Sequence, residues 1–355
     1  MIHVVPRLVV LPDDPALGEF RQQFAGMLGM IEERPDEGEA DQLRVAGFDL
    51  IIGSDRFQER LLEGPEDRVN GRAMLRARLL DAILNDRDRH WDQWRWAEFE
   101  RQEIRYWRPI PEDRDYVFVD FNGILPSLAA RVFAHFVSFD DELPTVEELN
   151  QNATDMDRRL LAELPRSAWD STAAFLQAAL TEEVIADAVR QLPKPYQEEV
   201  GGSLQRTLLA RRDALPAFAR QWYSWLSSEV DVHGTDAAEI AIAEYQPDGS
   251  LEVRLYAEQE GEAAGSPFYL RRFRPDETNE VRIYLHDGND AAVVRGTVSS
   301  SSIGVRVLGG PGIDTLTDSS YVRSGARVSF HDASGDDNQF NLSRHTQPGL
   351  LQHRG

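Results

Sequence analysis

A change in residue pattern near Asp231 constrains this chain more than any other feature. Before it, apolar residues recur at helical spacing in three stretches, 67–84, 172–192 and 204–230. After it, short runs rich in β-branched and aromatic residues alternate with turns rich in glycine and aspartate. We therefore predict an α+β protein, in which a mainly helical part is followed by a β-rich domain of solenoid or sandwich type.

The boundary between the two parts is predicted at about residue 232. The resulting ranges are 1–232, 233–345 and a flexible tail, 346–355. Three short apolar runs in the first part are expected to be strands: 6–11, 24–34 and 117–119.

Several turn and cap residues are expected to start or end elements within this pattern. Pro193-Lys194-Pro195 is expected to end the second helical stretch, and Pro216 to kink or split the third. Pro109-Ile110-Pro111 should break the chain, since each proline disfavours helix in the preceding residue. Thr145 fits a capping box that starts a helix. In the second part, Pro247-Asp248-Gly249-Ser250 predicts a hairpin.

Composition excludes several classes of protein. No run approaches the roughly 18 apolar residues of a membrane-spanning helix, and the first residues lack the basic and apolar regions of a signal peptide. The net charge of −23 argues against binding to nucleic acid, because the field of the whole molecule repels phosphate. The absence of cysteine excludes disulfides and thiolate metal sites.

Two acidic segments are the best candidates for chemistry. Asp86, Asp88, His90 and Asp92 follow the first helical stretch, and Asp113-Arg114-Asp115 precedes an apolar run. Carboxylates on two loops suit phosphoryl transfer, which needs one base for the acceptor hydroxyl and oxygen ligands for Mg²⁺. The alternative is a solvated charged surface, because 28% of the residues are charged. Three tryptophans near the first segment argue against that alternative: Trp91, Trp94 and Trp96.

The first segment, with Asp88-Arg89-His90 after a helix, resembles the catalytic loop of atypical kinases of the phosphoinositide, HipA-like, secretory-pathway and CotH-like types. The segment 113–118 looks like the metal-binding segment of the CotH type, and 24–33 resembles the strand leading into the hinge of that family. Residues 6–230 as a whole also look like a module of large bacterial cell-envelope proteins.

This resemblance implies the C-terminal lobe of a kinase that uses Mg²⁺ and ATP on an unknown acceptor. It implies Asp88 as catalytic base and a nucleotide contact near the hinge at Glu32 and Glu33. The implied metal ligands are Asp92 or Gln93 on the first loop, and Asp115 with Asp113 on the second. Three residues beside the base would shape the loop: Arg89, His90 and Trp91. An envelope protein partner and an extracytoplasmic location are also implied.

One departure from the kinase pattern concerns the phosphates. A kinase holds them with a lysine, but Lys194 is the only lysine in the chain, and no glycine-rich loop precedes Asp88. Arginine presents a bulkier planar fork with different geometry. Three alternatives stay open: an N-terminal lobe outside this chain, an arginine in place of the lysine, or a non-catalytic interaction or scaffold module.

The β-rich part contains one motif of its own. Residues 309–317 match the nonapeptide G-G-x-G-x-D-x-U-x of calcium-binding parallel β-rolls, with a weaker echo at 286–293. Asp290 and Asp314 are the possible calcium ligands, and a calcium-binding β-roll is a third functional hypothesis. They lie 24 residues apart rather than nine, so we expect a β-unit with Gly/Asp corners and no obligatory metal.

Overall fold

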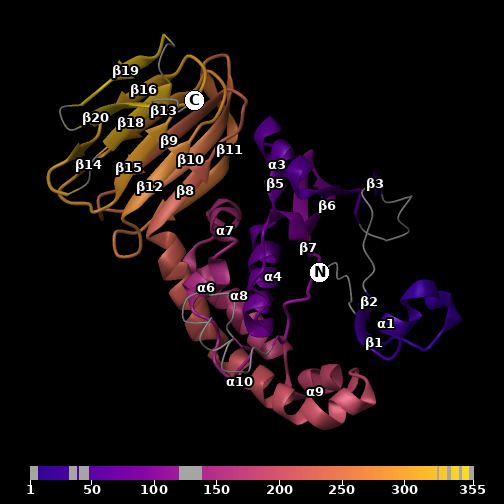
Figure 1. The fold of residues 1–355 in the computed structure, drawn as a ribbon. Helices are drawn as coiled ribbons and strands as arrows, with labels where there is room; N and C mark the ends of the chain where they lie inside the picture. The colour runs from indigo at the N-terminus through magenta and orange to yellow at the C-terminus, as the bar shows by residue number, and fades with distance from the viewer. Residues whose placement is uncertain are drawn as a thin grey trace.

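The computed structural model describes seven ranges: 7–31, 38–39, 48–119, 138–325, 328–333, 337–343 and 346–351. Helices fill the middle of the chain and strands its last third, which confirms the α+β class. Figure 1 shows a small N-terminal unit, a central sheet with helices, and a β-solenoid at the far end. No helix in these ranges is long and apolar enough to span a membrane.

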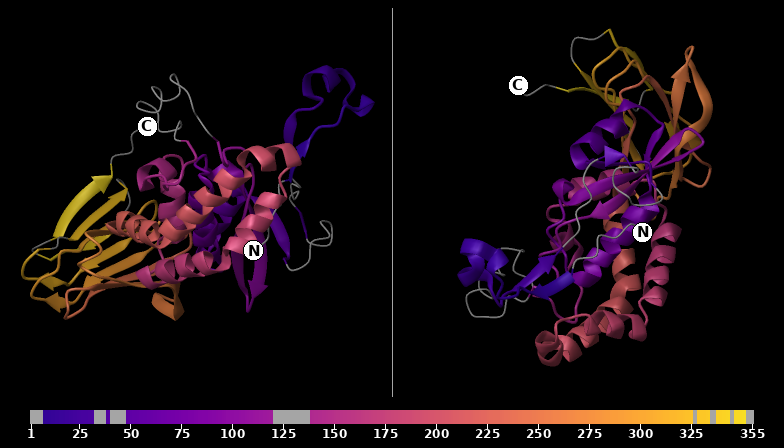
Figure 2. Two further views of the ribbon diagram at one scale, coloured as in Figure 1. Left: turned by 90° about the horizontal axis from the view of Figure 1, so that it is seen from below. Right: turned by 90° about the vertical axis from the view of Figure 1, so that its right-hand side faces the viewer.

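The N-terminal unit is a two-stranded antiparallel sheet. Strand β1 (Arg7–Val10) pairs with β2 (Leu28–Ile31), in agreement with the strands expected in 6–11 and 24–34. Between them lie a 3-10 helix, η1 (Pro15–Phe20), and the short helix α1 (Arg21–Phe24). In both views of Figure 2 this unit projects from the central part.

The central sheet has five strands in the order β3-β4-β6-β7-β5. Their bounds are β3 (Gly38–Glu39), β4 (Leu50–Gly53), β5 (Asp67–Val69), β6 (Trp94–Arg101) and β7 (Ile104–Pro111). Strands β6 and β7 form a hairpin in which Trp96 pairs with Pro109. The expected break at Pro109-Ile110-Pro111 is therefore wrong, because these residues end an extended strand that proline tolerates.

Seven helices in the described part accompany this sheet. They are α3 (Ser54–Glu63), α4 (Gly71–Leu84), α6 (Val146–Asn150), α7 (Thr154–Leu161), α8 (Arg166–Ala179), α9 (Glu182–Arg190) and α10 (Lys194–Ser227). Helix α6 begins with the expected capping box, in which the Thr145 side chain accepts from the Glu148 amide and the Glu148 side chain accepts from the Thr145 amide.

Several helix boundaries differ from the prediction. The stretch 67–84 begins as β5, and its helix starts only at Gly71, where the Asn70 side chain caps it. The stretch 172–192 is two helices, because Thr181 starts a new one by accepting from the Val184 amide. Helix α10 starts at Lys194 and runs through Pro216 as one element, since its packing against α8 and α9 outweighs the missing hydrogen bond.

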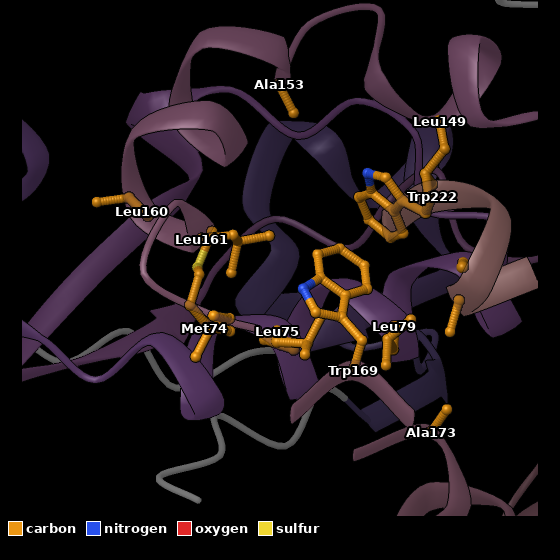
Figure 3. Close-up of a cluster of buried hydrophobic side chains, with 14 of the residues drawn as sticks. Met74, Leu75, Leu79, Leu149, Ala153, Leu160, Leu161, Trp169, Ala173 and Trp222 are labelled. Carbon is orange, nitrogen blue, oxygen red and sulfur yellow. The ribbon is translucent and has the colours of Figure 1, made fainter. Parts of the chain in front are cut away.

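The core of the central part joins α4 to the helices that follow it in the chain. Met74, Leu75 and Leu79 of α4 belong to one cluster of buried side chains with Trp169 of α8 and Trp222 of α10, part of which Figure 3 draws. The two indole rings meet edge to face, with 5.5 Å between their centroids. The contacts of α4 with α8 and α10 hold α4 in place, and with it the loop that follows α4.

The second part is a parallel β-solenoid whose chain alternates between two sheets. One sheet has the order β20-β18-β15-β12-β8, and the other β11-β10-β9-β13-β16-β19. The strands are β8 (Glu229–His233), β9 (Glu239–Tyr245), β10 (Leu251–Gln259), β11 (Glu262–Phe273), β12 (Glu280–Tyr284), β13 (Ala291–Arg295), β14 (Thr297–Val298), β15 (Gly304–Leu308), β16 (Thr315–Asp318), β17 (Tyr321–Val322), β18 (Val328–Ala333), β19 (Gln339–Asn341) and β20 (Thr346–Leu351).

The coils from β13 to β16 and from β16 to β19 take 24 residues each, whereas in the other sheet β15 to β18 takes 23. Ala291 pairs with Thr315, and Thr315 with Gln339, each in parallel register. Strands β9 and β10 form the expected hairpin, and β10 and β11 extend one sheet as an antiparallel insertion. The solenoid begins with β8 at Glu229, three residues before the expected boundary at about 232. Residues 346–351 form β20 and pair with β18, so the expected flexible tail is largely a strand.

Candidate functional site

The first acidic loop begins where α4 ends. Asn85 adopts a left-handed conformation (φ 62°), and its amide donates to the carbonyl groups of Asp81 and Ala82. Asparagine tolerates this conformation better than most residues, so it ends the helix there. The chain then reverses, which puts Asp86 into the interior beneath the loop and leaves Asp88 half-buried at its surface.

An ionic cluster with equal numbers of arginines and aspartates lies beneath this loop. Its members are Arg78, Asp81, Asp86, Arg89, Arg114 and Asp157. Nε of Arg78 lies 3.0 Å from Oδ1 of Asp157, and Nη1 lies 3.0 Å from Oδ2 of Asp81. Arg89 donates to Asp86, and its guanidinium lies over the Trp94 ring. Buried charges need such pairing to offset their loss of hydration.

Arg114 of the second acidic segment is part of the same cluster. Its Nη1 lies 2.9 Å from Oδ1 of Asp81 and 3.2 Å from Oδ2 of Asp86. Burial raises the pKa of Asp86 to about 6 with help from Asp81, against the opposing effect of Arg89 and Arg114. The backbone joins the loops as well, since the Glu112 amide donates to the Gln93 carbonyl over 2.9 Å. The two acidic loops therefore lie side by side.

Asp88 is held at both of its carboxylate oxygens. Nδ2 of Asn152, in the turn between α6 and α7, donates to Oδ1 over 2.9 Å. Nε2 of Gln93 approaches Oδ2 at 3.5 Å, while Oε1 of Gln93 accepts from Arg89 at 3.3 Å. A metal role for Gln93 would require the bond to Arg89 to be exchanged. Asp88 is thereby positioned as a hydrogen-bond acceptor facing the surface.

Asp113 and Asp115 lie close enough to Asp88 to affect one another. Partial burial, the negative charges of Asp113 and Asp88, and a hydrogen bond with Asp113 raise the pKa of Asp115. Asp113 adopts a left-handed conformation (φ 52°) that turns the chain here. Among the residues that the structure describes, no group of three or more Asp, Glu, His or Cys side chains could hold a metal by itself.

The other predicted site residues fall in different places. Nδ1 of His90 lies 3.8 Å from Oδ2 of Asp92; the His90 side chain is half-buried and that of Asp92 is exposed. The buried Arg89, rather than His90, shapes the loop by donating to Asp86 and to the Glu112 carbonyl. The Trp91 carbonyl accepts from the Ser54 hydroxyl and so ties the loop to α3. Glu32 and Glu33 lie outside the described residues.

The run 117–119, expected to be a buried strand, is part of a turn instead. The Val117 amide donates to the Arg114 carbonyl, and Phe118 takes a left-handed conformation (φ 63°). The phenylalanine ring then packs on Phe139, with 5.0 Å between the centroids. The second acidic loop is thus a compact turn held by Arg114 on one side and Phe118 on the other.

Sequence reasoning missed Asn152 and the structural role of Arg114. Asn152 is 64 residues from Asp88, and a lone asparagine after a short helix carries no local signal. Arg114 was visible between two aspartates, but its partners Asp81 and Asp86 are 33 and 28 residues away. Only an alignment of many related chains, or the fold itself, would have indicated these pairs.

The possible calcium residues line a corner between the two solenoid sheets. Oδ1 of Asp290 accepts from the Glu239 amide, and Oδ1 of Asp314 accepts from the Asp290 amide, both over 2.8 Å. Asn338 accepts from the Asp314 amide in the same way. The spacing of 24 residues equals one coil here. Asp290 and Asp314 therefore lie on adjacent coils, although they are not nine residues apart as in the nonapeptide repeat. Burial and neighbouring carboxyls raise the pKa of Asp290 to about 8.

Comparison with known proteins gives little further guidance. No family model and no curated protein matches the chain. A solved structure that resembles it is HipA from the toxin–antitoxin system of Shewanella oneidensis MR-1, in complex with HipB and its operator DNA. The identity is 15% and the TM-score 0.32, with 62% of this chain covered. The match spans about half of the HipA chain (54%), and no function is inferred from it.

Proposed function

We propose that the central part of the chain is a kinase-like phosphotransferase module that uses a magnesium nucleotide. The observation that carries this proposal is the position of Arg114, whose ion pairs with Asp81 and Asp86 bring the second acidic loop beside Asp88. Phosphoryl transfer asks mainly for positioned charge, and two adjacent loops of carboxylates on a fixed ionic base suit that demand.

In this proposal Asp88 is the general base. It accepts the proton of an acceptor hydroxyl while the acceptor oxygen bonds to the γ-phosphorus of the nucleotide. The bond from that phosphorus to the β–γ bridging oxygen breaks, and the nucleoside diphosphate leaves. The amide groups of Asn152 and Gln93 donate to its two carboxylate oxygens and fix the direction of the side chain.

Asp113 and Asp115 are the residues that would hold Mg²⁺. The mutual repulsion that raises the pKa of Asp115 is the kind that a bound cation relieves. Mg²⁺ is usually held by one or two carboxylates, with phosphate oxygens and water completing its shell. Two loop carboxylates without a third fit that preference, and the ion would supply neutralising charge at the phosphates.

Calorimetric titration of the full chain with Mg·ATP tests the proposal. We expect Asp115→Ala to weaken binding by about tenfold or more, because a charge-assisted contact is lost. Asp187→Ala is the matched control, since this exposed aspartate lies on α9 and pairs with Arg190. Equal affinity of Asp115→Ala and the parent chain would remove the metal role.

A measurement of turnover distinguishes the role of the proposed base from that of the proposed metal ligands. Asp88→Asn keeps the shape and the contact with Asn152, so we expect it to bind Mg·ATP normally but to transfer no phosphoryl group to water or protein. The competing hypothesis is a non-catalytic envelope-associated scaffold, which the lack of any lysine other than Lys194 favours. Absence of any Mg·ATP binding by the parent chain would favour the scaffold and overturn the kinase-like proposal.

A second candidate function, calcium binding by the solenoid, is favoured by the coil length. Asp290 and Asp314 lie on adjacent coils, and each uses Oδ1 for a backbone amide. Oδ2 of Asp290 and Oε2 of Glu239 are buried and accept no hydrogen bond within the described part of the chain. A cation at this corner would offset the buried negative charge.

Thermal unfolding with calcium or with a chelator tests this candidate. If calcium binds, the melting temperature rises with free calcium, since a ligand of the folded state adds stability. Asp290→Asn should abolish the rise, while Asp187→Ala should retain it. A melting temperature that calcium and chelator leave unchanged would contradict calcium binding.

A further inference from the structure

A separate cavity lies at the junction between the central part and the solenoid. It has a volume of about 110 Å³ and is formed where β5 and the end of α3 meet α7, the end of β8, and β11. The junction is closed by hydrogen bonds, including Asp236 N–H to the Leu62 carbonyl (2.6 Å) and the Tyr269 hydroxyl to the Ala162 carbonyl (3.3 Å). Figure 1 shows α7 and β8 in contact at this place.

Arg159 supplies positive charge to the cavity wall. Burial lowers the pKa of its guanidinium, and Asp236 opposes that shift. Among the described residues, no carboxylate lies within 4.0 Å of it and no hydrogen bond engages it. The adjacent Arg158 behaves differently, since it donates to the Glu229 carbonyl over 2.8 Å. Arg159 is thus a cation that faces a cavity without a fixed partner in the described structure.

Glu163 supplies the opposite charge at the rim of the cavity, on a residue that is exposed to solvent in part. Loss of hydration around its carboxyl raises the pKa of that group, and the positive charge of Arg68 opposes the effect. Nε of Arg68 donates to the Pro65 carbonyl over 3.0 Å, and no ion pair within 4.0 Å joins Arg68 and Glu163. The cavity therefore presents a cation and an anion that do not neutralise each other directly.

His233 adds a neutral polar group. Burial and the positive charge of Arg159 lower its pKa to about 3, so the ring is uncharged near neutral pH. Its Nδ1 lies 3.0 Å from Nε2 of His286, and its ring stacks on Tyr284. His233 lines the cavity and so adds an uncharged polar side chain to its wall.

We propose that this junction cavity binds a small α-amino acid in its zwitterionic form, with the carboxylate at Arg159 and the ammonium group at Glu163. A simple anion would be repelled by Glu163, and a simple cation by Arg159, whereas a zwitterion satisfies both. The volume is several times the roughly 10–15 Å³ that one water requires, so it admits a small organic molecule. The site is independent of the proposed phosphotransferase.

Calorimetric titration of the full chain with glycine, L-alanine and L-serine tests the proposal, with acetate and methylammonium as single-charge probes. We expect at least one of the three amino acids to bind at least about tenfold more tightly than either probe, because each charge contributes its own charge-assisted bond. No heat from any of the three amino acids at about 10 mM would overturn the proposal.

Two variants separate the charges. Arg159→Gln should abolish binding of the amino acid, and Glu163→Gln should reduce its affinity to that of acetate. The matched controls are Arg272→Gln and Glu262→Gln, which alter exposed charges on the solenoid and should bind as the parent does. If Arg159→Gln fails to fold, Arg159→Lys should fold and bind more weakly. Unchanged affinity in Glu163→Gln would contradict the assignment.

Discussion

The central part and the solenoid bury negative charge in different ways. In the central part, the buried carboxylates of Asp81 and Asp157 both contact the buried guanidinium of Arg78. In the solenoid, Glu239 and Asp290 are buried as deeply, yet no arginine, lysine or histidine of the described residues lies within 4.0 Å of either. Glu239 accepts from Thr235, and Asp290 accepts from a backbone amide.

This difference decides what each part needs from its surroundings. A cluster with equal numbers of arginines and aspartates carries its own counterions, so its stability depends on every member being present. A corner of carboxyl groups has to be neutralised from outside the chain, by protons or by a cation. Burial is the main cause that raises the pKa of both Glu239 and Asp290 to about 8.

The largest expected effect is on the paired charges. Arg78→Met leaves Asp81 and Asp157 buried without their shared partner, so we expect a loss of about 3–5 kcal/mol in the free energy of unfolding. Urea unfolding, followed by tryptophan fluorescence of the central part, measures it. Arg60→Met removes a surface pair with Glu63 and should cost less than about 1 kcal/mol. A similar loss of unfolding free energy in the two variants would contradict the view that the buried charges of the central part depend on their pairing.

The next effect concerns the pH dependence of the solenoid. Because the folded-state pKa values of Glu239 and Asp290 are raised, their stabilising contribution is complete below the unfolded values near pH 4. It declines as the pH rises and is lost above about pH 8. The slope is at most about 1.4 kcal/mol per pH unit for each group. Thermal unfolding in chelator between pH 5 and 9 measures this decline.

Asp290→Asn sharpens that test, because Asn338 occupies the corresponding position one coil beyond Asp314 and accepts the same kind of amide bond. The variant should fold and show a shallower decline with pH. A decline as steep as that of the parent chain would mean that other groups titrate. If calcium removes the decline in the parent chain, a cation rather than a proton neutralises the corner near neutral pH.

A smaller effect is expected at Asn152, which positions the proposed base. Asn152→Ala removes the bond to Oδ1 of Asp88, so we expect turnover of Mg·ATP to fall about tenfold while its binding is unchanged. Asn152→Asp, which places a second carboxylate beside Asp88 and cannot donate in its ionised form, should lower turnover at least as much. A change in binding alone would contradict the positioning role.

The smallest effect is expected at a helix cap of the central part. Thr145→Ala removes the capping box of α6, and we expect a cost of about 1 kcal/mol in the free energy of unfolding. Thr181→Ala removes a cap without the reciprocal side-chain bond and should cost less. Denaturant unfolding of both variants gives the order, and the pH dependence of the solenoid should be the same in each.

The broad division of the fold was predictable because it depends on local periodicity. The helices and the short strands differ in the spacing of their apolar residues along the sequence, and that spacing alone indicates which type of element forms. The hairpin β6–β7 was not predicted, although Trp94 and Trp96 alternate with the less buried Arg95 in the period of a strand. The charge and aromatic density of that segment suggested a loop, and the prolines at the end of β7 concealed its partner.

The candidate site was predictable in its acidic residues but not in the contacts that assemble it. We predicted that Asp113 and Asp115 lie near Asp88. The negative charges of Asp113 and Asp88 both raise the pKa of Asp115, which agrees with that prediction. Those positions depend on Arg114 and on ion pairs across about 30 residues, which no local pattern encodes. Their roles in catalysis and metal binding stay predictions.

The coil length of the solenoid has a consequence for its evolution and engineering. Because Asp290, Asp314 and Asn338 repeat at 24-residue steps, whole coils can be removed or added without changing which side chains meet. Deleting residues 291–314 would join Asp290 directly to Thr315 and shorten the domain by one strand spacing, roughly 4.8 Å. The length of this domain can therefore change in steps of one coil without a change in the side chains that face each other between coils.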